Sequence, residues 1–94
     1  MRKTTWLGNI YMTRRINEEI ANNYKFTEEI WLCFERYKNK DWGELCQEDK
    51  QMNDDAIKTG NERILAAYDT SKGKIYIITE HDYSATTILF ADEY

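Results

Sequence analysis

The sequence predicts an α+β fold in which three helices pack on a three-stranded antiparallel β-meander. Apolar residues recur at helical spacing in three segments of the first sixty residues. Three later segments, near 63–68, 74–79 and 85–90, are rich in β-branched and apolar residues, and short polar turns connect them. A chain of 94 residues supports one modest core, so residues 1–94 are expected to form a single domain.

The first part of the chain predicts a short strand followed by a helix. Residues 6–12 are extended in pattern and predict an edge strand added to the meander. Thr13 is a residue type that caps helices. The helix is predicted over 14–23, because its apolar side chains recur every four residues and share one face. These side chains are Ile16, Ile20 and Tyr24.

A second helix is predicted over 28–38, with Thr27 as its cap and two acidic residues, Glu28 and Glu29, in its first turn. Its buried face is expected to comprise Ile30, Cys33, Phe34 and Tyr37. Trp31 and Leu32 lie off that face. Together with the buried face they would make the apolar surface of this helix unusually wide. A surface of that width indicates either burial on two sides or an exposed contact patch.

A third helix is predicted over 47–58, with Gly60 beyond its last turn as the residue that ends it. Its packed face is expected to carry Leu45, Met52 and Ala56. The strand that follows, near 63–68, has apolar residues on both faces, so we expect it to be central in the sheet.

The composition is typical of a globular protein, with 41% hydrophobic and 32% charged residues. No apolar run approaches the roughly 18 residues of a membrane span, and residues 1–23 lack the apolar centre of a signal peptide. The protein is therefore expected to be soluble and cytoplasmic, without membrane contact. In that compartment Cys33 and Cys46 are expected to be reduced.

Charge is distributed unevenly along this chain of net charge −4. Residues 1–15 carry four basic and no acidic side chains, whereas residues 41–62 carry seven acidic and two basic ones. Carboxylates spread over a helix can present a surface that competes for a basic groove built to hold nucleic acid; a solvated helix face is the alternative. The carboxylates concerned are Glu44, Glu48, Asp49, Asp54, Asp55 and Glu62.

Few residues suggest chemistry. His81 is the one histidine, and in Glu80-His81-Asp82 a neighbouring carboxylate could orient its imidazole for general-base work. A turn histidine without a nucleophile is more often a hydrogen-bonding residue. Cys33 and Cys46 lack the further ligands that zinc needs, and the sequence has no glycine-rich phosphate loop. We therefore predict no catalytic residues, no metal site, no cofactor and no enzymatic activity.

A set of short motifs runs from residue 41 to residue 94 and covers slightly more than half of the chain. The motifs are Asp41-Trp42-Gly43-Glu44-Leu45, Glu48-Asp49-Lys50, Asn53-Asp54, Gly60, Arg63-Ile64-Leu65, Ala67-Tyr68, Ile77-Ile78-Thr79-Glu80, Asp82, Ser84-Ala85-Thr86-Thr87-Ile88-Leu89 and Glu93-Tyr94. This pattern resembles a widespread family of small uncharacterised proteins of plasmids, phages and integrated elements, often labelled plasmid-related proteins or restriction-modification subunits. The aromatic segment 30–40 departs from the usual pattern of that family.

The resemblance implies a mobile-element origin, and small acidic proteins of such elements frequently inhibit host defence. By analogy with anti-CRISPR and anti-restriction proteins, we expect a protein partner, a nucleic-acid-binding defence complex whose nucleic-acid-binding or activation surface this chain occupies. Direct nucleic-acid binding is not expected in that case. The alternative is an accessory or regulatory domain that binds nucleic acid through its basic amino-terminal segment. That segment contains Arg2, Lys3, Arg14 and Arg15.

Two tryptophans complete the candidate partner contacts. Trp31 and Trp42 are residue types that often anchor protein interfaces, and they join the carboxylates of Glu44, Glu48, Asp49, Asp54 and Asp55 as candidate partner-binding residues. In the corner Asp41-Trp42-Gly43, however, Trp42 is also expected to pack against the sheet as a buried hinge. The two expectations for Trp42 differ in how exposed the indole is.

Overall fold

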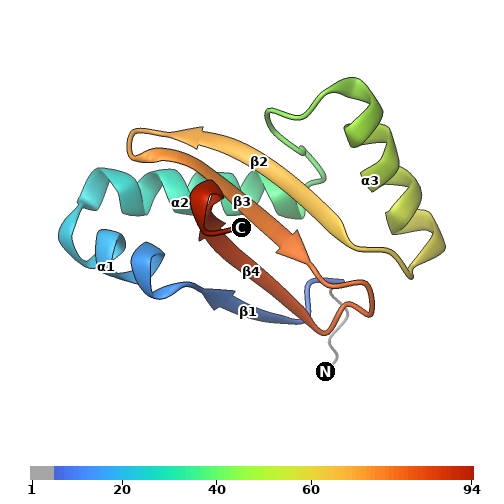
Figure 1. Cartoon of the computed structure of the whole chain (residues 1–94), viewed down its shortest axis with the longest axis horizontal. Coiled ribbons are helices and arrows are strands. Elements are labelled where there is room, and N and C mark those ends of the chain that lie inside the picture. The colour runs from blue at the N-terminus through green and yellow to red at the C-terminus, as the bar shows by residue number, and fades with distance from the viewer. Residues whose placement is uncertain (1–5) are drawn as a thin grey trace.

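The structure is a computed structural model that describes residues 6–94, and these residues form an α+β fold (Figure 1). The predicted class is therefore confirmed. Three helices accompany a four-stranded sheet of order β1-β4-β3-β2. In chain order the elements are β1 (Asn9–Met12), α1 (Arg14–Asn22), α2 (Tyr24–Lys38), α3 (Gln47–Thr59), β2 (Ile64–Thr70), β3 (Gly73–Thr79), β4 (Ala85–Phe90) and the short 3₁₀ helix η1 (Ala91–Glu93).

The sheet is mixed, so the prediction of a three-stranded antiparallel sheet is wrong in part. The meander of β2, β3 and β4 is antiparallel as expected. The predicted amino-terminal edge strand exists, but β1 runs parallel to β4, with Asn9 beside Ala85 and Met12 beside Ile88. The apolar pattern of a strand indicates its two faces and does not specify its neighbour, which is why the sequence did not reveal this parallel pairing.

The expectation that β2 is central is also wrong, because β2 is an outer strand. A passing segment pairs with its outer edge, through a bridge between Gly43 and Ala67. The Ala67 amide donates to the Trp42 carbonyl at 3.4 Å, and the Glu44 amide donates to the Ala67 carbonyl at 2.7 Å. Gly43 lies between these contacts with a φ of 79°, and any Cβ there would collide with the Ala67 carbonyl oxygen.

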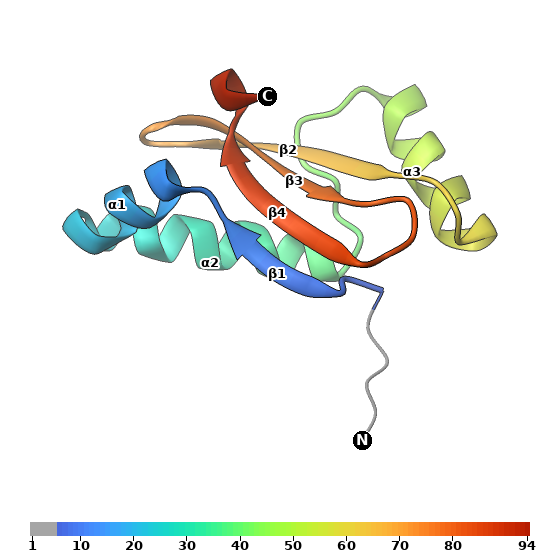
Figure 2. The ribbon, with the colours of Figure 1, turned by 60° about the horizontal axis from the view of Figure 1, so that its bottom comes forward.

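Helices α1 and α2 cover one face of the sheet, and η1 lies over the other (Figure 2). The helix-covered face is the core, and each strand alternates between this face and the opposite one. On the opposite face, the ring of Tyr94 meets that of Tyr76 edge-on, and the Tyr94 hydroxyl accepts a hydrogen bond from the Arg63 guanidinium. The largest core side chains with almost no exposure are Ile16, Phe26, Tyr37, Ile64, Tyr68, Ile75 and Ile77.

Helix α2 begins four residues earlier than predicted. Its cap is Asn23, whose side-chain oxygen accepts the Phe26 amide at 3.1 Å. The predicted cap, Thr27, lies inside the helix, and its hydroxyl donates to the Ile20 carbonyl at 3.0 Å and so ties α2 to α1. Glu28 and Glu29 therefore lie beyond the first turn of the helix. Asn23 caps the helix instead of Thr27 because its extended backbone places the side-chain amide oxygen over the free N–H groups of the first helical turn.

Helix α3 packs against the edge of β2 through Asn53, and the prediction that Met52 packs there is wrong. The Met52 side chain is 63% exposed. The buried Asn53 amide group donates to the Leu65 carbonyl at 2.9 Å and accepts from the Leu65 amide at 3.4 Å. An outer strand presents unpaired backbone groups, so a polar side chain suits this position of the helix better than an apolar one.

A chain of buried hydroxyl groups links α2, β3, β4 and the segment before β1. Tyr37 lies 2.7 Å from Thr79 between oxygens, and Thr79 lies 2.7 Å from Thr86. Thr86 donates to the Leu7 carbonyl at 2.6 Å. Because that carbonyl can only accept, donation runs from Tyr37 towards Leu7. Burial also raises the pKa of the Tyr37 phenol far above its usual range, so the phenol stays protonated and able to donate.

Thr79→Val tests this hydroxyl chain. Valine keeps the shape of threonine but leaves the hydroxyls of Tyr37 and Thr86 without their shared partner. We expect a loss of about 1–3 kcal/mol in the free energy of unfolding, measured by urea denaturation. Thr87→Val, on the opposite face of β4, is the matched control and should change stability by less than about 0.5 kcal/mol. Equal unfolding midpoints for the two variants would contradict the proposed role of the chain.

Trp42 is 2% exposed, which confirms the expected buried corner. Its ring meets Tyr37 and Trp6 edge-on, with centroids 5.5 and 6.1 Å away. Trp42→Ala should therefore cost about 3–5 kcal/mol of unfolding free energy. Trp31→Ala is the comparison, because Trp31 is 68% exposed and its removal should cost less than about 1 kcal/mol. Similar losses for both variants in thermal or urea unfolding would refute this assignment.

Candidate protein-binding surfaces

Four exposed carboxylates lie on α3 and the loop before it. We call Glu44, Glu48, Asp49 and Asp55 the acidic surface; all four are exposed. The ion pairs found among residues 6–94 involve other carboxylates. Asp55 accepts only a neutral hydrogen bond, from the Gln51 amide at 3.1 Å. Within the described part of the chain, these charges are therefore available to a partner.

Asp54 and Trp42, both predicted to contact a partner, instead contact each other. The indole N–H of Trp42 donates to the Asp54 carboxylate at 2.9 Å. This bond fixes α3 to the corner before it, and the buried indole presents no surface to another protein. We therefore assign both residues a structural role and leave them out of the acidic surface.

The exposed Met52 lies within the acidic surface. Glu48, Met52 and Asp55 are spaced four and three residues apart on α3, so they share one face of the helix. This spacing is the one by which a helix presents its anchors to a groove in another protein. Met52 adds a flexible apolar contact between two carboxylates. This arrangement is complementary to a protein surface on which basic side chains surround an apolar side chain.

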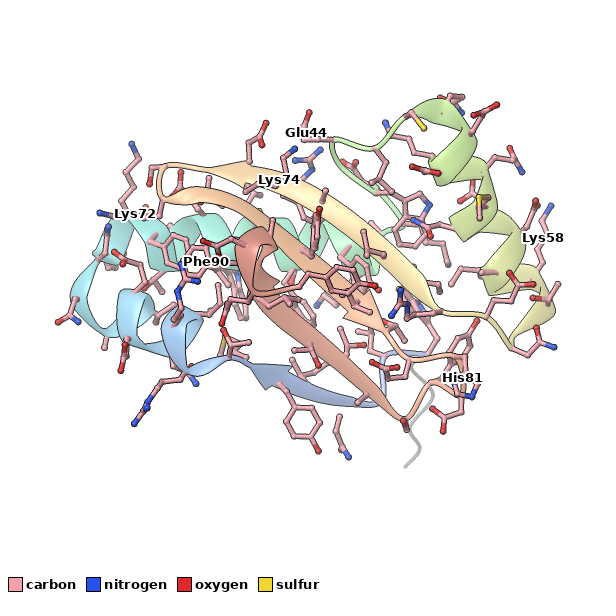
Figure 3. The ribbon with its side chains drawn as sticks, in the orientation of Figure 1. Glu44, Lys58, Lys72, Lys74, His81 and Phe90 are labelled. Atoms are coloured by element: carbon pink, nitrogen blue, oxygen red, sulfur yellow. The ribbon has the colours of Figure 1, made fainter. Side chains whose placement is uncertain are left out.

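Helix α3 projects from the body of the protein. Figure 1 shows it beside β2, apart from α1 and α2, and Figure 3 shows Glu44 on the loop that leads into it. Its end is fixed by Gly60, which has a φ of 75° and whose amide donates to the Ala56 carbonyl at 2.8 Å. With Asn53 bound to β2, the helix offers a convex and firmly attached carboxylate surface.

A second surface, the apolar surface, lies between β1 and α2. It surrounds a groove of about 300 Å³. Trp31 separates this groove from a shallower hollow of about 420 Å³ that contains Tyr24 and Leu32. The residues that we include in the apolar surface are Ile10, Met12, Trp31 and Phe34.

Trp31 is thus exposed, and of the two alternatives for residues 31 and 32 the structure excludes burial on two sides. Leu32 is exposed as well. Sequence reasoning missed Ile10 and Met12 as members of this surface. They could have been found from their positions on the predicted edge strand. Residues two apart on a strand lie on the same face, so Ile10 and Met12 both lie on the face that α2 covers.

The basic amino-terminal segment is largely neutralised where it is described. Arg14 pairs with Glu18 at 3.7 Å. Arg15 pairs with Asp92 at 2.7 Å, and its guanidinium lies 4.7 Å from the centre of the Phe90 ring. The Asp92 carboxylate raises the pKa of Arg15. Arg2 and Lys3 lie outside the described residues.

The segment Glu80-His81-Asp82 forms the turn between β3 and β4. The Ser84 amide donates to the Asp82 carboxylate at 3.0 Å, and hydrogen bonding to Ser84 lowers the pKa of Asp82. His81 is exposed at the tip of this turn, well away from Glu44 (Figure 3). These contacts are those of a stabilised turn, in which the Asp82 carboxylate already accepts a hydrogen bond from the backbone.

Among residues 6–94, no group of three or more His, Cys, Asp and Glu side chains is arranged to hold a metal ion. No helix of the described chain is long and apolar enough to cross a bilayer. The chain matches no protein-family model, and no curated protein or solved structure is significantly similar to it.

The two cysteines should differ sharply in reactivity. Burial raises the pKa of the Cys33 thiol to about 11, which leaves about 0.1% thiolate at pH 8, and the thiolate is the reactive form. Cys46 is exposed. Iodoacetamide at pH 8 should therefore modify the folded protein once, at Cys46, as measured by intact mass and peptide mapping. A folded Cys46→Ser variant should stay unmodified, and rapid labelling of its Cys33 would contradict this prediction.

Proposed function

We propose that this chain is a small non-enzymatic binding protein of a mobile element that inhibits a host defence nuclease of the CRISPR or restriction type. In this proposal the acidic surface occupies a basic nucleic-acid-binding or activation surface of the nuclease in the cytoplasm. The observation that carries the proposal is the set of exposed carboxylates on a projecting helix and the loop before it, which make no ion pair within residues 6–94. The mobile-element context comes from the sequence resemblance.

The spacing of the acidic surface suits this role. Glu48 and Asp55 are seven residues apart, which corresponds to about 10 Å along a helix that rises 1.5 Å per residue. Phosphates of one DNA strand recur about every 3.4 Å along the duplex axis, so the two carboxylates span about three phosphate steps. A basic groove that neutralises phosphates over this distance can also attract the helix.

Electrostatic attraction explains how such a protein would compete with nucleic acid. Charges of opposite sign steer the encounter and exclude wrongly oriented complexes. The Met52 side chain, 63% exposed between the carboxylates, supplies contact area that a phosphate backbone lacks. This addition favours a specific protein partner over a general polycation.

The alternative function, nucleic-acid binding through the basic segment, has weaker support. Arg14 and Arg15 both have acidic partners within the fold, and the acidic surface would repel phosphates. A gel-shift titration at low and moderate salt tests it directly. Retardation of nucleic acid that weakens with added salt and disappears in an Arg14→Ala/Arg15→Ala variant would favour this alternative.

Charge reversal tests the proposed function. Asp54 is unsuitable because it binds Trp42, so the test variant is Glu48→Lys/Asp55→Lys. We expect unchanged thermal stability within a few degrees, because exposed carboxylates contribute little to folding. In phage or plasmid interference assays against several defence systems, inhibition should fall by roughly tenfold or more. In binding measurements with the nuclease that these assays identify, the loss of affinity should lie mainly in the association rate and shrink as salt increases.

The matched control is Glu18→Lys/Glu28→Lys, which changes the net charge equally on α1 and α2. It should retain inhibition, and so should His81→Ala, since we propose no chemistry at that turn. Equal loss in both charge variants would indicate an effect of net charge alone. Full activity of the α3 variant together with loss in His81→Ala would overturn the proposal and point to catalysis at residues 80–82.

A further inference from the structure

The two outer strands of the sheet differ in how well they are covered. On β2, the backbone of Ala67 bonds to the segment around Gly43, and Leu65 bonds to Asn53. At the two ends of β1, the Asn9 amide donates to the carbonyl of Ser84, just before β4, and the Thr13 amide donates to the carbonyl of Ile88 in β4, at 3.1 Å each. In a parallel ladder alternate residues point their backbone groups to opposite sides, so Ile10 and Met12 direct theirs outward.

The open edge of β1 lacks the usual protection against pairing. Proteins commonly protect such edges with charged side chains, proline or bulges, whereas β1 reads Asn-Ile-Tyr-Met. Every one of its side chains is exposed. Ile10 is 44% exposed and Met12 is 38% exposed on the helix-covered side, and Tyr11 is 53% exposed on the other. The edge is therefore apolar on both sides and able to accept a further strand.

We propose that β1 pairs with β1 of a second copy of this chain, antiparallel and centred on Tyr11, to form one continuous eight-stranded sheet. This interaction goes beyond the proposed function and involves a different surface. The register is self-complementary: Ile10 faces Met12 of the second copy in a hydrogen-bonded pair, and Met12 faces Ile10 in another. Each pair exchanges two backbone hydrogen bonds, and these use the groups that point outward.

Side chains around the edge suit a symmetric partner. In this register the two Tyr11 rings meet as a non-hydrogen-bonded pair, where side chains are closest. On the helix side, Ile10, Met12 and Trp31 border the apolar groove, and the same residues of the second copy extend it. A fully buried aromatic side chain contributes roughly 150–250 Å², so Tyr11 and Trp31 of both copies contribute on the order of 500 Å².

This area, with Ile10, Met12 and the edge backbone, approaches the lower limit of specific interfaces, about 1,200 Å² in total. The corresponding dimer is of moderate affinity, with a dissociation constant on the order of 1–100 μM. Such a dimer exchanges with monomer at the concentrations used in solution measurements, which makes it directly testable.

Charges also favour a second copy as the occupant of this edge. Asn9, at one end of β1, lies beside the turn of residues 80–84, and Arg14 follows the other end. Antiparallel pairing therefore brings Arg14 of each copy, which stays 90% exposed in its pair with Glu18, towards the acidic Glu80 and Asp82 of the other. The acidic surfaces repel each other least in this arrangement, because α3 packs on β2, at the opposite edge of the sheet (Figure 1).

Sedimentation velocity over roughly 1–300 μM full-length chain tests the dimer. Wild type should shift from monomer to dimer over this range. Tyr11→Lys places two like charges directly opposite each other in the proposed register, and it should raise the dissociation constant by roughly tenfold or more. Tyr24→Lys, the same change at another exposed tyrosine, should dimerise as wild type does, and so should Glu48→Lys/Asp55→Lys.

Disulfide trapping tests the register, in a Cys46→Ser background that removes the exposed native thiol. Cα atoms of a non-hydrogen-bonded pair lie about 4.5 Å apart, within the range that a disulfide bridges. Tyr11→Cys should therefore form a covalent dimer under mild oxidation, and Tyr24→Cys should not. A monomeric wild type at the highest concentration, or equal behaviour of the two positions in either assay, overturns the proposal.

Discussion

The fold depends on a run of buried hydroxyl groups that joins four segments of the chain. Each hydroxyl, from Tyr37 through Thr79 to Thr86, donates a hydrogen bond to the next acceptor, and the last acceptor is the Leu7 carbonyl. A buried hydroxyl without a partner costs free energy of the order of the hydrogen bond it loses. α2, β3, β4 and the segment before β1 are therefore held at one relative position, because sliding any of them would leave several polar groups unpaired.

Polar contacts also decide which edge of the sheet is open. Asn53 and the segment around Gly43 occupy the backbone of β2, and the Trp42–Asp54 bond fixes α3 to that segment. The same contacts that close this edge also position the carboxylates of α3. Among residues 6–94, no segment covers the outer edge of β1 in this way. The protein thus presents a charged convex surface at one edge of its sheet and an apolar extended surface at the other, so two different interactions can occur without competing for the same residues.

Sequence reasoning predicted the elements better than their neighbours. The three helices and the meander follow from local periodicity, and the off-face position of Trp31 correctly raised the possibility of an exposed patch. The parallel pairing of β1 and the outer position of β2 depend on contacts between residues distant in sequence, which periodicity does not encode. Met52 and Asn53 show the same limit. Apolarity favoured Met52 for the packed face, but the unpaired backbone of Leu65 selected Asn53. For the candidate surface, the acidic cluster was visible in the sequence, whereas the bond that removes Asp54 from it was not.

The pairing of β1 with β4 has a consequence for the order in which the protein can fold. Asn9 and Ala85 are partners in the sheet although most of the chain separates them. During synthesis β1 is made first, and it has no strand to pair with until β4 has left the ribosome. Helices α1 and α2 can form early from local contacts, but their core face stays uncovered for the same period. Closing so long a chain segment to bring β1 and β4 together is slow compared with local folding. The nascent chain therefore exposes apolar side chains, including Ile16 and Phe26, until its last strand arrives, and it is in this interval that chaperones would contact it.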